Sequence, residues 1–139
     1  MAKLIINTDG GSRGNPGPAA AGILIRLDSK KLFSGGKYLG EATNNIAEYK
    51  ALILAINWVL EHKKKIVFDE IQFLLDSELI VKQMTGDYKV KDEKMKELFS
   101  IATSKLSKLE TPFNFKHVKR EKNTVADGLV NAILDNPRV

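Results

Sequence analysis

A segment dense in glycine and proline interrupts the N-terminal part of the chain. Residues 9–18 contain four glycines and two prolines, which predicts a loop or a sharp turn. The runs on either side, 3–8 and 19–27, are apolar and β-prone, and a short turn at 28–30 leads into a third such run at 31–39. Strands joined by so short a turn must be antiparallel, and the first two runs can pair in the same way across the loop. The sequence therefore predicts that the fold begins with three antiparallel strands.

From residue 45 onward, helical and strand patterns alternate. Residues 45–61 lack glycine and proline and carry apolar residues at helical spacing, which predicts a long buried helix. The other predicted elements are a strand at 71–75, a helix at 77–84, a helix at 92–108, a strand at 112–118 and a last helix from an N-cap at Asn123 to about residue 135. This order predicts a mixed α/β fold with a sheet of about five strands. Because 139 residues is a typical length for one domain, we expect a single domain over 1–139.

The composition excludes several classes of protein. Hydrophobic residues make up 43% of the chain and charged residues 28%, as in an ordinary globular domain and unlike a disordered or collagen-like chain. There is no cysteine, which excludes disulfides and thiolate metal sites. The longest strongly apolar run, 51–60, is about half the roughly 20 residues that a membrane span needs. We therefore expect a cytoplasmic monomer without membrane attachment, and no protein partner is implied.

The positive charge of the chain is concentrated in one segment. The net charge is +5, and residues 81–122 hold eleven Lys and Arg against six Asp and Glu, while the rest of the chain is neutral. This distribution predicts a polyanionic partner such as a nucleic acid. A lysine-rich face that is merely solvated is the alternative, and charge alone does not decide between the two.

Four carboxylates occupy positions that suggest a common site. Asp9 and Asp76 end the first and fourth predicted strands, and Glu48 and Asp127 lie in the first turns of two predicted helices. If the first and fourth strands are parallel neighbours, Asp9 and Asp76 meet outside the carboxyl edge of the sheet. Such a cluster needs cations to stay ionised, and Mg²⁺ or Mn²⁺ suits an all-oxygen set of ligands.

Each of these residues also has a purely structural interpretation. Asp9 precedes two glycines and can form a turn, and Glu48 can close a capping box with Asn45. Asp76 can serve as a helix N-cap, and Asp127 can favour the positive end of a helix dipole. Position alone leaves these alternatives open.

Four motifs together resemble type 1 ribonuclease H. They are Asp-Gly-Gly-Ser-Arg-Gly-Asn-Pro-Gly-Pro at 9–18, Thr-Asn-Asn-Ile-Ala-Glu at 43–48, Asp-Ser at 76–77 and Ala-Asp at 126–127. Their order and spacing agree with that family over essentially the whole chain. The resemblance implies a ribonuclease H-like α/β fold, with a five-stranded mixed sheet whose first three strands are antiparallel, flanked by helices. It also implies a metal-dependent endoribonuclease that hydrolyses the RNA strand of RNA–DNA hybrids with two Mg²⁺ ions, or Mn²⁺ as a substitute, and leaves 5′-phosphate and 3′-hydroxyl ends.

The resemblance also assigns roles to individual residues. It implies that Asp9, Glu48, Asp76 and Asp127 are the catalytic, metal-binding carboxylates. The residues expected to bind nucleic acid are Gly10, Gly11, Ser12, Asn15, Thr43, Asn44, Asn45 and, as a phosphate contact specific to this sequence, Arg120. Without the motif, turn formation for Asn15 and helix capping for Thr43 or Asn45 would be the favoured interpretations.

The sequence departs from many members of that family in two places. Residues 86–92 run directly into the next helix, so the extra basic protrusion is expected to be absent. The loop before the last helix, 119–123, contains Arg120 but no histidine, and His117 in the strand ahead of it is interpreted as structural or exposed. Gly128 inside the last helix is unexplained except by close contact with a neighbouring element.

Two further functions stay open at this point. The chain could be another nuclease of the same fold that also cuts double-stranded RNA, or a module that binds hybrids with weak or no catalysis. The presence of all four carboxylates argues against a purely binding role.

Overall fold

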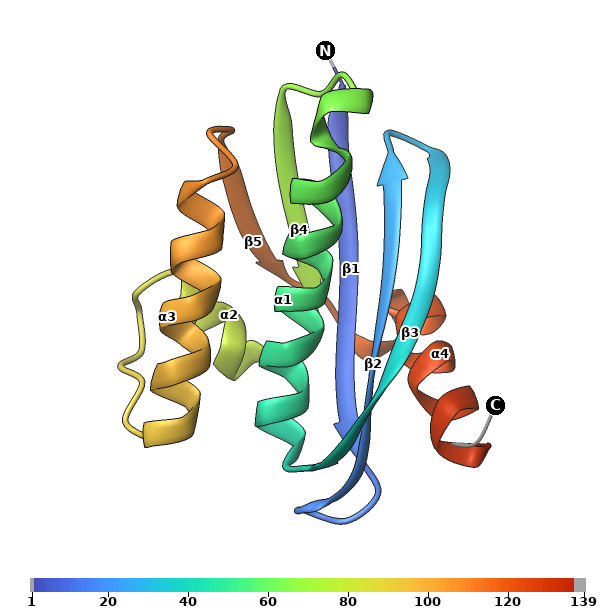
Figure 1. Ribbon diagram of the computed structural model, residues 1–139, viewed down its shortest axis with the longest axis vertical. Helices are drawn as coiled ribbons and strands as arrows, with labels where there is room; N and C mark the ends of the chain where they lie inside the picture. Colours follow the sequence, from blue (N-terminus) through green and yellow to red (C-terminus); the bar gives the residue numbers. More distant parts are fainter. Residues whose placement is uncertain (1, 137–139) are drawn as a thin grey trace.

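Five strands form one mixed sheet in the order β3-β2-β1-β4-β5 (Figure 1). The structure is a computed structural model that describes residues 2–136. The strands are β1 (Lys3–Ser12), β2 (Gly17–Leu27), β3 (Lys30–Ala42), β4 (Glu70–Leu75) and β5 (Phe113–His117). The helices are α1 (Asn44–His62), α2 (Glu78–Met84), α3 (Glu93–Ser107) and α4 (Thr124–Asp135), with single 3₁₀ turns at η1 (Lys63–Lys65) and η2 (Arg120–Lys122).

The strand pairing agrees with the expected topology. β1, β2 and β3 are antiparallel neighbours, whereas β4 pairs in parallel with β1 and β5 in parallel with β4. Thr8 lies opposite Leu75 in the β1–β4 pair, so the next residue of each segment, Asp9 and Asp76, emerges at the same edge of the sheet. The parallel pair thus brings together the two carboxylates that the sequence placed at strand ends.

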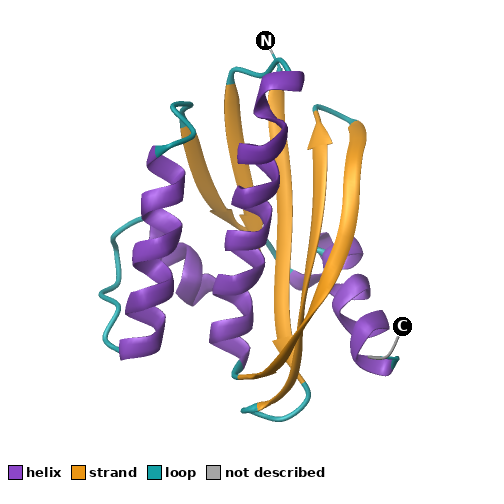
Figure 2. Cartoon of the chain, in the orientation of Figure 1, coloured by secondary structure: helices purple, strands orange, loops and turns teal. Residues whose placement is uncertain are grey.

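Helices cover both faces of the sheet (Figures 1 and 2). α1 lies against β1 and β2, with α3 beside it, and α4 lies against β1, β2 and β3 from the opposite face. Fully buried apolar side chains from the strands and from α1 form the core, among them Ile6, Ile23, Leu52, Ile56 and Phe73. The alternation of buried and less buried residues along β4 shows that one of its faces packs on this core.

The predicted loop at 9–18 is wrong over most of its length. β1 continues to Ser12 and β2 already begins at Gly17, so that only residues 13–16 form the turn. Glycine weakens a strand but does not forbid one, and here Gly10 and Gly11 pair with Ala21 and Ala20 across the β1–β2 ladder. β1 and β2 therefore pair over a longer stretch than the sequence indicated, and β3 accompanies β2 as far as Gly17.

Two other expectations concern the second half of the chain. Residues 85–92 connect α2 directly to α3, so no additional basic helix lies between them, as expected. Close contact does not explain Gly128, because a Cβ built at this exposed position would meet nothing within 4 Å. Among the described residues 2–136, no helix is long and apolar enough to span a membrane.

Candidate active site

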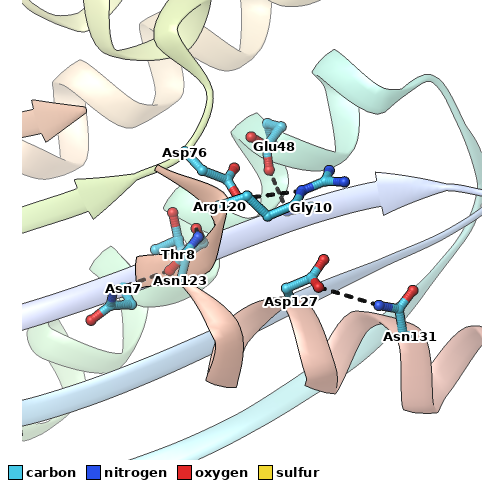
Figure 3. Close-up of polar contacts among 9 residues, drawn as sticks. All are labelled: Asn7, Thr8, Gly10, Glu48, Asp76, Arg120, Asn123, Asp127 and Asn131. Carbon is cyan, nitrogen blue, oxygen red and sulfur yellow. Dashed lines mark hydrogen bonds and ion pairs between the residues drawn. The ribbon is translucent and has the colours of Figure 1, made fainter. Parts of the chain in front are cut away.

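Three of the four predicted carboxylates converge at the carboxyl edge of β1 and β4. Asp9 of β1, Glu48 of α1 and Asp76 after β4 each offer an oxygen atom, and these atoms lie within 4.8 Å of one another. Asp9 and Glu48 are buried, with 4% and 7% of their surface exposed. The close-up in Figure 3 shows Glu48 and Asp76 on one side of β1. This grouping brings together side chains from three elements that are distant in sequence.

Two glycines allow helices to approach Asp9 from both faces of the sheet. A Cβ at Gly10 would overlap the carbonyl oxygen of Ala47 in α1, and the Gly10 N–H donates a hydrogen bond to Glu48 Oε1. On β2, Gly22 lies opposite Asp9, and a Cβ there would overlap the carbonyl oxygen of Ala126 in α4. Because successive strand residues point to opposite faces, Asp9 faces α4 while Gly10 faces α1. The missing side chains thus bring Glu48 and α4 close to Asp9.

Burial shifts the titration of the two innermost carboxyl groups. Burial, followed by the negative charge of Asp76, raises the pKa of Asp9 from 3.8 to about 7, while a hydrogen bond with Glu48 acts in the opposite direction. Burial likewise raises the pKa of Glu48 well above its ordinary value of 4.5, and the charge of Asp9 is the next cause. Without a cation, burial and mutual repulsion therefore disfavour the ionised forms of these carboxyl groups.

The donor set fits a hard divalent cation. Asp76 Oδ2 is buried and accepts no hydrogen bond, although the Arg120 Nε atom lies 4.0 Å from it. A buried carboxylate oxygen without a partner is costly, and a bound ion would satisfy it. A set of ligands made only of carboxylate oxygens suits Mg²⁺ and Mn²⁺, which prefer hard oxygen donors. Asp9, Glu48 and Asp76 are thus suited to hold such an ion.

Asp127 stands apart from this group of three. It lies on α4, is only partly buried, and accepts a 3.4 Å hydrogen bond from Asn131 Nδ2 (Figure 3). It is still near enough to interact with Asp9, because both its charge and a hydrogen bond raise the Asp9 pKa. The fourth carboxylate therefore borders the cluster from the opposite face of the sheet.

The carboxylates lie in a pocket of about 440 Å³ between α1 and α4. Its walls include all four carboxylates, Arg13 and Arg120, as well as the predicted contact residues Gly10, Gly11, Ser12, Asn44 and Asn45. Asn15 and Thr43 are not among its lining residues. Instead, Asn15 Oδ1 accepts a 2.9 Å hydrogen bond from the Asn44 N–H, and Asn44 Oδ1 accepts one of 2.9 Å from the Ser12 N–H. These bonds fasten the β1–β2 turn to the start of α1.

The side chains that cap α1 and α2 are not the carboxylates for which a capping role was considered. Thr43 caps α1 by accepting from the Ile46 N–H at 3.2 Å, whereas Glu48 bonds to Gly10, so the proposed capping box with Asn45 is absent. Ser77, not Asp76, caps α2. Hydroxyl side chains take the capping role at both positions, and the neighbouring carboxylates remain directed into the site.

Sequence reasoning missed two residues near the site. Arg13 lines the pocket, and its Nη2 atom lies 2.8 Å from Asp135 Oδ1 at the end of α4. Asn123, expected to cap α4, makes no side-chain cap; its buried amide donates to the Thr8 carbonyl at 2.9 Å instead. Asn7, a polar residue inside an apolar strand, accompanies it and was the available signal for a buried polar contact.

Comparisons with known proteins agree on one family. Residues 7–133 match the family model described as "Reverse transcriptase-like". The chain is 41% identical over 129 residues to ribonuclease HI of Halobacterium salinarum, covering 92% of this chain and 62% of that protein. It is 39% identical over 135 residues to the bifunctional protein Rv2228c of Mycobacterium tuberculosis, covering 96% of this chain and 36% of that protein.

Solved structures extend the similarity to three dimensions. The structure of LC11-RNase H1 in complex with an RNA/DNA hybrid superposes with a TM-score of 0.89 at 45% identity, over 98% of this chain and 99% of that one. The chain spans between about one third and two thirds of the length of the two curated relatives above. Its similarity to LC11-RNase H1, by contrast, extends over nearly the full length of both chains.

Proposed function

This chain belongs to the type 1 ribonuclease H family, and we propose that it is a metal-dependent endoribonuclease that hydrolyses the RNA strand of RNA–DNA hybrids. The observation that carries the proposal is the group formed by Asp9, Glu48 and Asp76, whose carboxylate oxygens lie within 4.8 Å of one another in an open pocket. The hybrid bound to the related LC11-RNase H1 supports the choice of substrate.

The four carboxylates are proposed to share the work of holding the metal ions and the scissile phosphate. When bound, two Mg²⁺ or Mn²⁺ ions would activate water and stabilise charge on the leaving 3′ oxygen, giving 5′-phosphate and 3′-hydroxyl ends. Asp9 and Asp76 supply ligands from adjacent strand ends, and the Gly10 N–H fixes the orientation of the Glu48 carboxylate. Asp127 completes the set from α4.

The rim of the pocket is proposed to distinguish RNA from DNA. The backbone of 10–12 and the side chains of Asn44 and Asn45 line the pocket beside Glu48. Such backbone and amide groups can hydrogen-bond to ribose 2′-hydroxyls in the minor groove. Arg120 contributes positive charge for a phosphate, and Asn15 and Thr43 are proposed to contact nucleic acid from the adjoining turn and helix start.

A direct assay tests this function. Labelled RNA–DNA hybrid, double-stranded RNA and double-stranded DNA are each incubated with the protein in Mg²⁺, Mn²⁺ or EDTA. We expect cleavage of the hybrid only, no reaction in EDTA, and 3′ ends that a polymerase can extend. Cleavage of double-stranded RNA at a comparable rate would favour the broader nuclease.

Two isosteric variants test the site within the same assay. Asp9→Asn and Asp76→Asn remove charge without volume and should each abolish hybrid cleavage. Asp28→Asn makes the same chemical change in the exposed β2–β3 turn and should leave the rate unchanged. Near-normal turnover of Asp9→Asn would contradict the assignment of the metal ligands.

A further inference from the structure

Asn123 forms hydrogen bonds to three separate parts of the site. Its side chain is 1% exposed, and its amide donates to the Thr8 carbonyl oxygen at 2.9 Å, immediately before Asp9 in β1. The backbone of the same residue accepts from the Asp127 N–H at 3.1 Å and donates to the Arg120 carbonyl oxygen at 2.9 Å. One buried residue therefore links strand β1 to the backbone of Arg120 and of Asp127, and Figure 3 shows its side chain beside Thr8 and Asn7.

A second layer of hydrogen bonds holds the Asn123 amide in place. Asn7 Nδ2 donates to Asn123 Oδ1 at 3.0 Å, and Arg26 Nη2 donates to Asn7 Oδ1 at 3.2 Å. This chain of contacts crosses from the loop through β1 to β2. Both polar atoms of the Asn123 amide are engaged, so its orientation is determined by the strands and not by α4.

As a result, α4 lacks a side-chain hydrogen bond at its N-cap. Asparagine at this position normally accepts a hydrogen bond from the first turn and stabilises the helix. In α4 the Asn123 side chain makes no such bond and points toward β1 instead. If the only role of Asn123 were to stabilise α4, its side chain would accept a hydrogen bond from the first turn of that helix. The hydrogen bond to β1 that it forms instead therefore calls for a functional explanation.

We propose that Asn123 is a positioning residue: it ties the start of α4 to β1 and thereby sets where Asp127 and Arg120 lie relative to Asp9 and Asp76. This inference rests on the proposed function, because it assigns Asp127 to the same metal centre. Partners that orient metal ligands in this way typically change metal affinity or activity by roughly 10–100-fold when they are removed.

The test separates the tie to β1 from the missing helix cap. Asn123→Ser leaves a side chain that caps a helix well but is one bond too short to reach the Thr8 carbonyl, whereas Asn123→Ala removes both capacities. Mn²⁺ affinity is measured by calorimetry without substrate, and hybrid cleavage is measured against Mn²⁺ concentration. We expect Asn123→Ser to weaken Mn²⁺ binding about 10-fold, with most of kcat recovered at saturating Mn²⁺.

A double-mutant cycle shows whether Asn123 acts through Asp127. In the Asp127→Asn background, Asn123→Ser should cause no further loss of Mn²⁺ affinity. An equal loss in both backgrounds, or wild-type affinity in Asn123→Ser, would overturn the proposal. If Asn123→Ser does not fold, Asn7→Ala takes its place in the cycle, because it weakens the same contact without changing the loop.

A control variant and the behaviour of the wild type show how the Mn²⁺ affinities are to be interpreted. Gln83→Ala truncates another buried amide, one that accepts a 2.6 Å hydrogen bond from Tyr49, and should lower the melting temperature without changing Mn²⁺ affinity. If the wild type binds Mn²⁺ but does not cut the hybrid, the proposed function fails. The Mn²⁺ affinities of the variants would still decide whether Asn123 positions Asp127.

Discussion

Asp9 lies on the central strand of the sheet, where α1 and α4 come closest to it from opposite faces. Burial and the charge of Asp76 raise its pKa to about 7. In the unfolded chain the same group titrates near 3.8. The folded state therefore holds a proton that the unfolded state has already lost between about pH 4 and pH 7. In the absence of metal, this carboxyl group makes the protein less stable as the pH rises through that window.

Replacing this carboxyl group should therefore stabilise the metal-free protein. We expect Asp9→Asn in EDTA to raise the free energy of unfolding at pH 8 by roughly 1–3 kcal/mol, since each pKa unit corresponds to about 1.4 kcal/mol. The gain should shrink as the pH falls and vanish below about pH 3, where the wild-type group is protonated in both states. Urea unfolding at several pH values measures both effects. A mutant less stable than the wild type at pH 8 would show that the carboxylates do not repel one another as described.

Arg120 is the cationic side chain paired with Asp76, at 4.0 Å, and it is 78% exposed. An arginine stays charged at any working pH, so it can hold a phosphate but cannot transfer a proton. Arg120→Ala should lower kcat/KM at every pH without altering the shape of the pH profile. Arg120→Lys should recover only part of the rate, because bidentate contact is lost.

His117 provides the comparison for this prediction. It is exposed on β5 and does not line the pocket. His117→Ala should therefore keep the wild-type rate. A larger loss of rate in His117→Ala than in Arg120→Ala would mean that His117, and not Arg120, contributes to the reaction.

At the scale of helices and strands, glycine has opposite consequences in two places. Gly128 lies inside α4 with open space where a Cβ would be, whereas a Cβ at Gly22 would overlap the Ala126 carbonyl oxygen. Gly128→Ala should stabilise the protein by about 0.5–1 kcal/mol through helix propensity. Gly22→Ala should destabilise it and weaken metal binding, because α4 must move away from Asp9. Urea unfolding and Mn²⁺ titration of both variants measure these effects, and a destabilised Gly128→Ala would contradict the first.

The elements also show what the sequence could and could not predict. The spacing of apolar residues and the positions of turn residues correctly predicted five strands and four helices, because each element carries its own apolar pattern. The extension of β1 through Ser12 was missed, since the reason for a glycine at position 10 of a strand, the close approach of the α1 backbone, is visible only in the folded chain. The contact between Asn123 and Thr8 was also missed, because it joins residues 115 positions apart.

At the scale of the whole molecule, the positively charged segment 81–122 reaches the carboxylate pocket through Arg120, which lines it. Lys89 and Lys91 are exposed in the connection between α2 and α3, and Lys119 and Lys122 are exposed beside Arg120. Replacing these four lysines with alanine should raise KM for the hybrid. It should also reduce the dependence of log K on log salt by about 0.9 for each lysine that contacts a phosphate.

A matched set of lysines lies at the other end of the sheet. Lys30 and Lys31 follow the β2–β3 turn near the start of β1, and Lys64 and Lys65 follow the C-terminus of α1. Replacing these four changes the net charge equally but should leave the salt dependence nearly unchanged. If both quadruple variants behave alike, only net charge matters, and the lysines of segment 81–122 form a merely solvated face.

The position of α4 has a consequence for the local stability of the site. α4 is the last helix of the described chain and carries Asp127, while the other three carboxylates belong to β1, α1 and the end of β4. Local opening of this helix would remove one of the proposed ligands, Asp127, and leave the core of the sheet intact. A divalent ion held by all four carboxylates would therefore stabilise the packing of α4 against the sheet. Amide hydrogens of α4 should then exchange more slowly with solvent when Mg²⁺ is present, and those in the centre of β1 should change little.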